Sequence, residues 1–203
     1  MIDTRQKLIE TAESLFADQG YSSVSLRQII AEAGVNLASV HYHFGSKEEL
    51  LDAVIAPKAQ SVNKERLARL ALVQPGSDGR PPIRALLDAF LMPMADAAER
   101  HPGFVKLMGR IHAEGLLPQI AAKHFAPVAV PFFAALRKAV PHLSEAELSW
   151  RLHFMVGAIA FAMAQTPMLG LADDANYHVR IARLATFLTG AFEAPVANPE
   201  VNQ

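Results

Sequence analysis

The chain has 203 residues, of which 51% are hydrophobic and 19% are charged, which is enough apolar material for a sizeable core and excludes a disordered chain. It contains no cysteine, which excludes disulfides, thiolate catalysis and cysteine-ligated metals. The net charge is −1, and residues 1–70 hold eight Lys/Arg and nine Asp/Glu, so no strongly basic domain is present to bind nucleic acid by charge alone.

Export and membrane signals are absent from the sequence. The first residues lead into an amphipathic pattern, and the longest strongly apolar stretch, residues 154–164, is shorter than the roughly 20 residues that span a bilayer. We therefore expect a cytoplasmic protein with no membrane partner.

Helical periodicity occurs throughout the chain, whereas strand patterns are nearly absent. A first helix is predicted by apolar residues that share one face, and Gly20 is expected to end it. The residues on this face are Leu8, Ile9, Ala12, Leu15 and Phe16. The expected fold class is all-α, with an N-terminal helix-turn-helix domain and a C-terminal helical bundle for ligand binding and dimerisation.

Residues 25–44 have the spacing of a helix-turn-helix. Ser25 and Gln28 form a capping-box pattern at the start of one helix, Gly34 permits a sharp turn, and Asn36 is placed to cap a short second helix that reaches Tyr42. In this motif the first helix crosses the DNA backbone and supports the second, which enters the major groove. The alternative is a helical hairpin unrelated to DNA.

The rest of the chain is divided by a Gly- and Pro-rich linker at residues 74–82. Before it, Ser46 and Glu49 predict the start of a connecting helix over 46–72, which Pro57 either kinks or ends early. After it we expect helices near 83–100, 104–114, 118–124, 127–140, 144–166 and 176–192, with Ser144 capping the fifth. The predicted domains are a DNA-binding domain over 1–56, a ligand-binding and dimerisation domain over 57–194, and a disordered tail over 195–203.

Residues 148–164 are apolar around nearly the whole helix circumference, so this helix is expected to be buried on several sides. Small residues such as Gly157 and Ala158 permit close helix packing. Together with the last helix, two copies of this segment would form an intersubunit four-helix bundle. The alternative is an ordinary core helix within one subunit.

Residues 8–55, LIETAESLFADQGYSSVSLRQIIAEAGVNLASVHYHFGSKEELLDAVI, resemble the DNA-binding head of TetR-family regulators, most specifically in YHFGSKEEL. The resemblance implies a homodimer that binds a palindromic operator on double-stranded DNA, usually as a repressor. The DNA contacts that it implies are Ser25, Arg27, Asn36, Leu37, Ser39, His41, Tyr42, His43 and Lys47. Phe44 is expected in the core instead, and the i, i+2 spacing of His41 and His43 does not suit a metal site.

The segment WRLHFMVGAIAFAM, residues 150–163, resembles the PsrA-like, fatty-acid-responsive branch of that family. It implies a small lipophilic effector, and this resemblance alone supplies the hypothesis that the effector is a long-chain acyl compound. The candidate lining of an apolar pocket is Phe90, Met94, Phe104, Met108, Ile111, Phe125 and Phe133, with Arg110 or His112 at the polar end of the ligand. The alternative is that the apolar residues only pack the core and Arg110 is solvated.

Two other functions are alternatives to a ligand-responsive regulator. A helical lipid- or protein-binding module without DNA function would suit the weakly acidic head. An enzyme is disfavoured because the sequence has no glycine-rich phosphate loop, nucleophile elbow or HExxH zinc motif, and no cofactor is expected.

Overall fold

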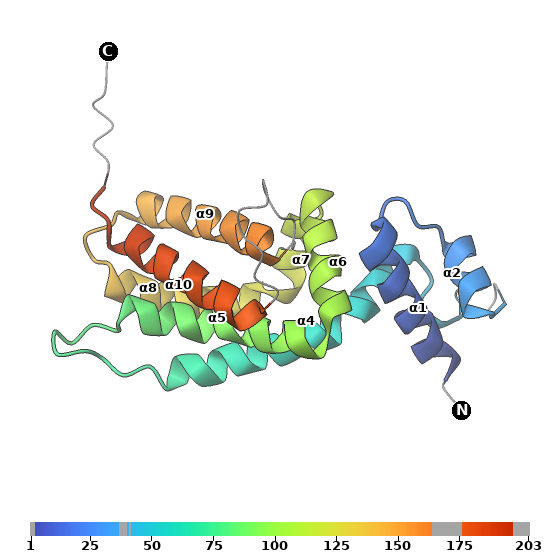
Figure 1. Ribbon diagram of the computed structural model, residues 1–203, viewed down its shortest axis with the longest axis horizontal. Coiled ribbons are helices and arrows are strands. Elements are labelled where there is room, and N and C mark those ends of the chain that lie inside the picture. The colour runs from blue at the N-terminus through green and yellow to red at the C-terminus, as the bar shows by residue number, and fades with distance from the viewer. Residues whose placement is uncertain (1–2, 37–39, 41, 164–175, 197–203) are drawn as a thin grey trace, which may run out of the picture.

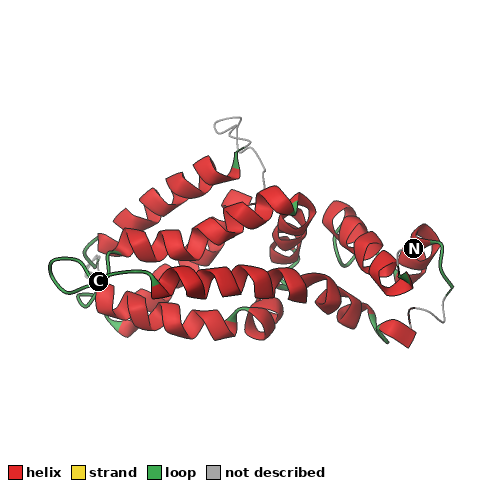
Figure 2. Ribbon diagram, turned by 90° about the horizontal axis from the view of Figure 1, so that it is seen from below, coloured by secondary structure: helices red, strands yellow, loops and turns green. Residues whose placement is uncertain are grey.

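The computed structural model describes residues 3–36, 40, 42–163 and 176–196, and every regular element in these ranges is a helix (Figure 2). The helices are α1 Thr4–Gln19, α2 Leu26–Ala33, α4 Lys47–Ala71, α5 Ile83–Arg100, α6 Pro102–Ala113, α7 Leu117–His124, α8 Ala126–Ala139, α9 Glu145–Met163 and α10 Tyr177–Glu193. α1, α2 and the first half of α4 form a head at one end, and α5 to α10 form a helical body behind it (Figure 1). The all-α prediction is confirmed.

The three predicted serine caps are confirmed. Each hydroxyl accepts a hydrogen bond from the amide three residues later: Ser25 from Gln28, Ser46 from Glu49, and Ser144 from Glu147. At α2 only this half of the capping box forms, because the Gln28 side chain donates to Gln19 Oε1 at 2.9 Å instead of reaching back to the cap. The start of α2 is thereby tied to the end of α1.

Pro57 lies inside α4 and does not end it, since the helix continues to Ala71. A proline removes one helical hydrogen bond and crowds the preceding turn. Ile55 and Ala59, on either side of it, are buried, and their packing offsets this cost. As a result, one helix runs from the head into the body (Figure 1).

The core of the head includes residues from a body helix. Phe104, Leu107 and Ile111 of α6 are buried in the same cluster as Phe16 of α1 and Leu50 of α4. Figure 1 shows α6 crossing between the head and the rest of the body. The orientation of the head therefore depends on the position of α6.

The C-terminal end of α10 is capped by a side chain from α9. Arg151, only 9% exposed, donates from Nη1 to the carbonyls of Ala191 at 2.6 Å and Ala194 at 2.8 Å, and from Nη2 to Pro195 at 3.2 Å. Its Nε donates to Glu147 Oε1 at 2.8 Å. The last carbonyls of a helix lack amide partners and carry partial negative charge, so a guanidinium is well suited to this position.

α7 and α8 meet at a bend of 83°. Within the described ranges no single helix is both long and apolar enough to cross a membrane, and only this bent pair reaches that length and composition when its two helices are joined. Val128 and Phe132 of α8 are buried against Ala89 of α5, so part of the pair's apolar surface is covered by the body itself.

We predict that Gly34→Ala destabilises the fold by about 1 kcal/mol, because Gly34 ends α2 in the left-handed region (φ 61°, ψ 40°), where a Cβ is strained. Gly103→Ala in α6 is the matched control, since its new Cβ would have only an ordinary contact, 3.8 Å from Glu13. Urea unfolding of the two variants checks this. Equal stability of both variants would contradict the assigned role of Gly34.

Candidate nucleic-acid interface and ligand pocket

The second helix of the helix-turn-helix presents an aromatic pair outward. Residues 40, 42 and 43 are helical, Val40 and Phe44 are buried, and Tyr42 is 85% exposed. The rings of Tyr42 and His43 contact edge to face, with centroids 5.0 Å apart. Burial of Val40 and Phe44 on one helix face therefore fixes the segment in the head and leaves Tyr42 on the opposite side in solvent, as a phosphate or base contact requires.

The other predicted DNA contacts are distributed around this segment. Ser25 and Arg27 are exposed at the start of α2, and Asn36 is exposed just after the turn. Leu37, Ser39 and His41 lie outside the described residues. The contacts of all these residues with DNA stay predictions.

Lys47 is turned toward the head rather than toward solvent. Its Nζ donates to the carbonyl oxygen of Tyr21 at 2.5 Å and lies 4.1 Å from the centre of the Tyr21 ring. Burial lowers the pKa of Lys47 below its ordinary value, although Glu114 and Glu48 oppose this shift. In this conformation Lys47 holds the start of α4 against the end of α1, and a phosphate contact requires the side chain to rotate.

Two cations in the first turns of α1 were missed by the sequence reasoning. The Arg5 guanidinium lies over the Phe44 ring, 5.3 Å from its centroid, and Arg5 lines the same groove as Tyr42 and His43. Lys7 Nζ is 3.8 Å from the position that a side chain on Gly34 would take. Among the described residues neither cation has a carboxylate at ion-pair distance. Their sequence positions gave no signal, because only the tertiary fold brings α1 beside the turn.

The junction between head and body is polar and specific. Glu114, just after α6, accepts hydrogen bonds from Ser22 N at 2.8 Å and Ser22 Oγ at 2.6 Å. Lys106 Nζ lies 2.6 Å from Asp18 Oδ1, and Lys58 of α4 pairs with the head's Glu13 at 2.7 Å. Together with the buried face of α6, the Glu114 and Lys106 contacts attach α6 to the head, and the Lys58–Glu13 pair joins α4 to α1.

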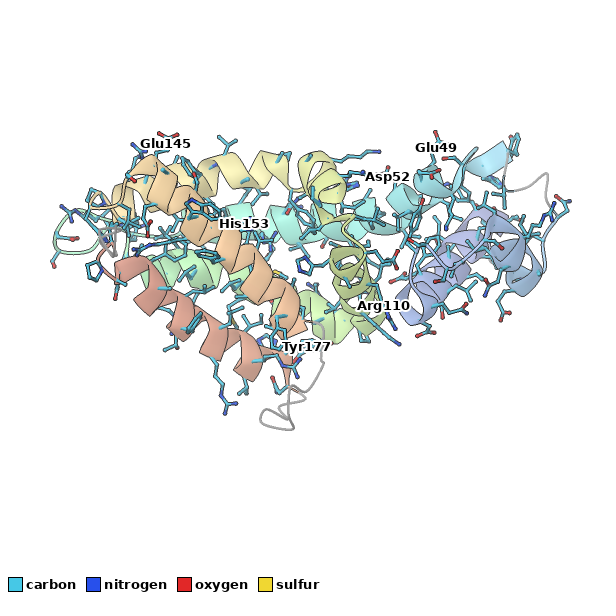
Figure 3. All side chains as sticks on the ribbon, turned by 90° about the horizontal axis from the view of Figure 1, so that it is seen from above. Glu49, Asp52, Arg110, Glu145, His153 and Tyr177 are labelled. Atoms are coloured by element: carbon cyan, nitrogen blue, oxygen red, sulfur yellow. The ribbon has the colours of Figure 1, made fainter. Side chains whose placement is uncertain are left out.

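Arg110 belongs to this junction, so its prediction as a ligand contact is wrong. Its Nη2 donates to the Asp18 carbonyl at 3.2 Å, and Figure 3 shows it where α6 faces the head. Ile111, also predicted in the pocket, is fully buried in the head core. Both errors have one cause, since the sequence places residues on a helix but does not say which neighbour each face meets.

A body pocket of about 180 Å³ lies among α4, α5, α6, α7 and α9. Six of the predicted residues line it: Phe90, Met94, Phe104, Met108, His112 and Phe125. Phe133 is not among them, and it lines a neighbouring groove of about 580 Å³ that shares Phe90 and Phe125 with the pocket. Most of the predicted lining is thus gathered at one place.

The sequence reasoning missed the main polar group of the pocket, which is Arg66 of α4. Arg66 is only 3% exposed and its guanidinium carbon is 3.9 Å from the Phe90 ring centroid. A signal was present, because Ala59, Val62 and Arg66 follow the i, i+3, i+7 spacing of one helix face. Because Ala59 and Val62 are apolar, this spacing indicates that the side chain of Arg66 points inward as well.

One face of α9 and α10 is apolar and exposed in the single chain, so α9 is not buried on several sides within one subunit. The buried residues of α9 are Leu148, Arg151, Met155 and Met163. Val156 of α9 lines the body pocket. The other exposed apolar residues of the two helices are Trp150, Phe154, Phe161, Val179 and Phe187. We call this set the α9/α10 face. A Cβ on Gly157 or Gly190 would meet nothing within 4 Å, so the surface there is open.

The fold and these sites define a class of protein, a helical regulator with a helix-turn-helix head and an apolar body pocket. Residues 8–54 match the family described as bacterial regulatory proteins, tetR family, and residues 84–191 match the tetracyclin repressor-like C-terminal domain. The chain belongs to the TetR family. Proteins of this family are transcription regulators and not enzymes; they bind DNA operators and act as dimers with small-molecule effectors.

Similar proteins share mainly the head. The chain is 43% identical over 56 residues to the HTH-type transcriptional regulator SrpR of Pseudomonas putida, a stretch that covers 28% of this chain and 26% of the relative. It is 37% identical over 82 residues to BetI of Rhizobium meliloti, covering 34% and 40%. It is 30% identical over 108 residues to the transcriptional repressor Rv3405c of Mycobacterium tuberculosis, covering 51% and 56%. The matched stretches therefore span about half or less of these relatives.

Solved structures match nearly the whole fold. The fatty acid degradation regulator FadR from Bacillus halodurans superposes with a TM-score of 0.66 at 10% identity, covering 94% of this chain and 96% of that one. The TetR family regulator PfmR from Thermus thermophilus gives 0.58 at 20% identity, covering 89% and 96%. At these identities the similarity concerns the fold alone.

Proposed function

We propose that two copies of this chain bind a palindromic operator through their helix-turn-helix segments, repress transcription there, and are released by a small lipophilic effector that occupies the body pocket. The observation that carries the proposal is the exposed Tyr42 on a helix that is otherwise fixed by buried Val40 and Phe44. A residue of this kind has no packing role in the subunit and is available to the duplex.

The α9/α10 face supports pairing with a second copy. Aromatic side chains such as Phe154 and Phe187 are 64% and 68% exposed, and a monomer in water rarely presents so many neighbouring apolar groups. A two-fold axis through this face that runs along the long axis of the subunit would place the two heads at the same end of the assembly (Figure 1). A two-fold dimer reads two half-sites about one DNA turn apart, which a single short helix cannot do.

The position of α6 supports communication between pocket and head. Phe104 lines the pocket and is also buried in the head core, so one side chain contacts both. An effector that binds one arrangement of α6 more tightly shifts the population toward it and changes how Glu114 and Arg110 hold the head. Loss of the DNA-competent spacing would then release the operator.

The proposal is tested by gel shift with DNA from the protein's own promoter at several salt concentrations. We expect binding at low salt that weakens as salt rises, with a log–log slope of about −0.9 for each phosphate neutralised. Absence of binding at low salt, or binding that salt does not weaken, would falsify the DNA-binding function.

We predict that Tyr42→Phe weakens operator binding about tenfold, the value of one hydrogen bond to a phosphate, while the unfolding transition is unchanged. Tyr21→Phe is the matched control, because Tyr21 packs on Phe16 inside the head, with ring centroids 5.3 Å apart. Fluorescence anisotropy with labelled operator measures both variants. If Tyr42→Phe binds like the wild type, the hydroxyl does not contact DNA.

We predict that Glu114→Gln lowers stability at pH 7 by less than about 1 kcal/mol, a small effect because Glu114 is half-exposed. Burial raises the pKa of Glu114, but hydrogen bonds from Ser22 outweigh it, and the pKa is lower than the ordinary 4.5. A carboxylate with a depressed pKa stabilises the fold above that ordinary value and loses this contribution as pH falls through the folded value. Urea unfolding should thus show a difference between the two proteins at pH 7 that disappears below pH 4.5. A difference independent of pH contradicts this role.

A further inference from the structure

Arg66 is a buried cation whose hydrogen bonds go to neutral groups. Its Nε donates to the Phe90 carbonyl at 2.8 Å, and its Nη1 lies at 3.5 Å from Asn63 Oδ1. These bonds use two of the five N–H donors of a guanidinium. Throughout the described part of the chain, no carboxylate lies within ion-pair distance of Arg66, whereas other buried or half-buried arginines, such as Arg151 and Arg69, have one.

The surroundings of Arg66 hold its guanidinium in place. The Phe90 ring lies against it at 3.9 Å and the Phe125 ring at 5.7 Å, measured to the centroids. Asn63 is itself fixed, since its Nδ2 donates to the His124 carbonyl at 2.6 Å. The cation is therefore held in one position before any ligand arrives.

An unpaired charge at this depth is energetically costly. Burial lowers the pKa of Arg66 to about 9, so it remains mostly protonated at neutral pH. Removing a cation from water without a counter-ion costs several kcal/mol, and an entering anion recovers much of this through charge-assisted hydrogen bonds. A ligand with a negative group therefore gains binding free energy from Arg66 that a neutral ligand of the same shape does not gain.

We infer that Arg66 recognises an anionic headgroup and that the effector is an apolar molecule carrying one carboxylate. This inference rests on the proposed ligand-responsive function and specifies its ligand. Apart from His112, the remaining lining is apolar, with Met94, Phe104 and Met108 around the space, so a second charge on the ligand would have no further permanently charged partner. A cationic ligand would be repelled by Arg66.

The space available limits the apolar part of the ligand. The pocket of about 180 Å³ is smaller than the roughly 300–1,000 Å³ of common ligand sites. The neighbouring groove of about 580 Å³ borders it at Phe90, Phe125 and Val156. A carboxylate at Arg66 therefore has room for a tail of medium length that passes these side chains into the groove.

The test is isothermal titration of the full chain with decanoate, 1-decanol and decyltrimethylammonium, which share one tail and differ in headgroup charge. For the wild type we expect decanoate to bind at least about tenfold more tightly than decanol, and the cation more weakly than both. This comparison needs no substitution. Equal affinity for decanoate and decanol would overturn the inference.

Arg66→Met should abolish the preference for decanoate while the protein stays folded, because removing an unpaired buried charge costs little stability. The matched control is Arg69→Met, one turn along α4, where the side chain pairs with Glu65 and Asp96 outside the pocket. Arg69→Met should keep the preference. Decanoate binding to Arg66→Met at wild-type affinity would assign Arg66 only to the contact between α4 and α5, and so overturn the inference.

The same three proteins are also titrated onto operator DNA without ligand. Operator binding by all of them, together with loss of the decanoate preference only in Arg66→Met, supports both proposals. Operator binding without any decanoate preference overturns the role of Arg66 and leaves the regulator function intact. Failure of the wild type to bind operator overturns the regulator function, whatever the ligand titrations show.

Discussion

Phe187→Glu is expected to convert the protein into a monomer and to weaken operator binding about 100-fold or more. Phe187 is 68% exposed on the α9/α10 face, and the substitution would bury two carboxylates against apolar partners in the proposed dimer. Without the dimer, the second head no longer binds as part of the same molecule, and such linkage is worth about 10²- to 10⁴-fold in affinity. Sedimentation velocity gives the mass and anisotropy gives the affinity.

Leu72→Glu is the matched control for this variant. Leu72 is also an exposed apolar residue, 75% exposed at the end of α4, but it lies outside the α9/α10 face. It should leave both the mass and the operator affinity unchanged. A Phe187→Glu protein that remains dimeric would show that the subunits pair through another surface.

Arg151→Met is expected to lower the free energy of unfolding by about 2–4 kcal/mol, the largest loss for any single substitution considered for this fold. The change leaves the carbonyls of Ala191 and Ala194 at the end of α10 without their donor and Glu147 without its partner. Because α10 packs on both α5 and α9, loosening its end weakens the body as a whole. Urea unfolding monitored by circular dichroism measures the loss.

Arg84→Met is the comparison for this loss. Arg84 also joins two helices, pairing with Asp88 on α5 and donating to Thr186 of α10, but 44% of its side chain is exposed. An exposed pair contributes at most about 1 kcal/mol, so this variant should remain close to the wild type. Similar losses for the two variants would mean that burial of Arg151 does not strengthen its bonds.

The features of the fold that were predictable are those set by neighbouring residues. The serine caps, the stop at Gly20 and the turn at Gly34 each depend on a few residues close in sequence, and all have the expected geometry. The resemblance to TetR-family heads implied Tyr42 as a DNA contact, with Phe44 expected in the core, and the two side chains are exposed and buried accordingly. Local chemistry was sufficient for these features because the helix ends and the turn are closed by their own residues.

The features that were not predictable depend on contacts between distant segments. Nothing in the sequence around Ile111 and Arg110 shows that α6 packs on the head rather than only on the pocket. The continuation of α4 through Pro57 depends on burial on both sides of the proline. Arg66 was missed because arginine is usually exposed, although Ala59 and Val62 on the same helix face indicated its inward direction.

The exposed α9/α10 face shows a second limit of prediction from sequence. Apolar composition predicts burial, but it does not distinguish burial within one subunit from burial between two. In the single chain Trp150 and Phe154 stack on each other in solvent, with ring centroids 5.8 Å apart. The sequence therefore predicted α9 as a helix, but it left open whether α9 packs within one subunit or against a second copy.

The most direct measurement of the central claim is the stoichiometry of the protein on DNA. A palindromic operator selected from random duplexes is titrated at protein concentrations far above the dissociation constant, and then again with one half-site scrambled. We predict two chains bound per operator and an affinity about 100-fold lower after scrambling. One chain per duplex, or an affinity that the scrambled half-site leaves unchanged, would contradict a dimer that presents two helix-turn-helix segments to DNA.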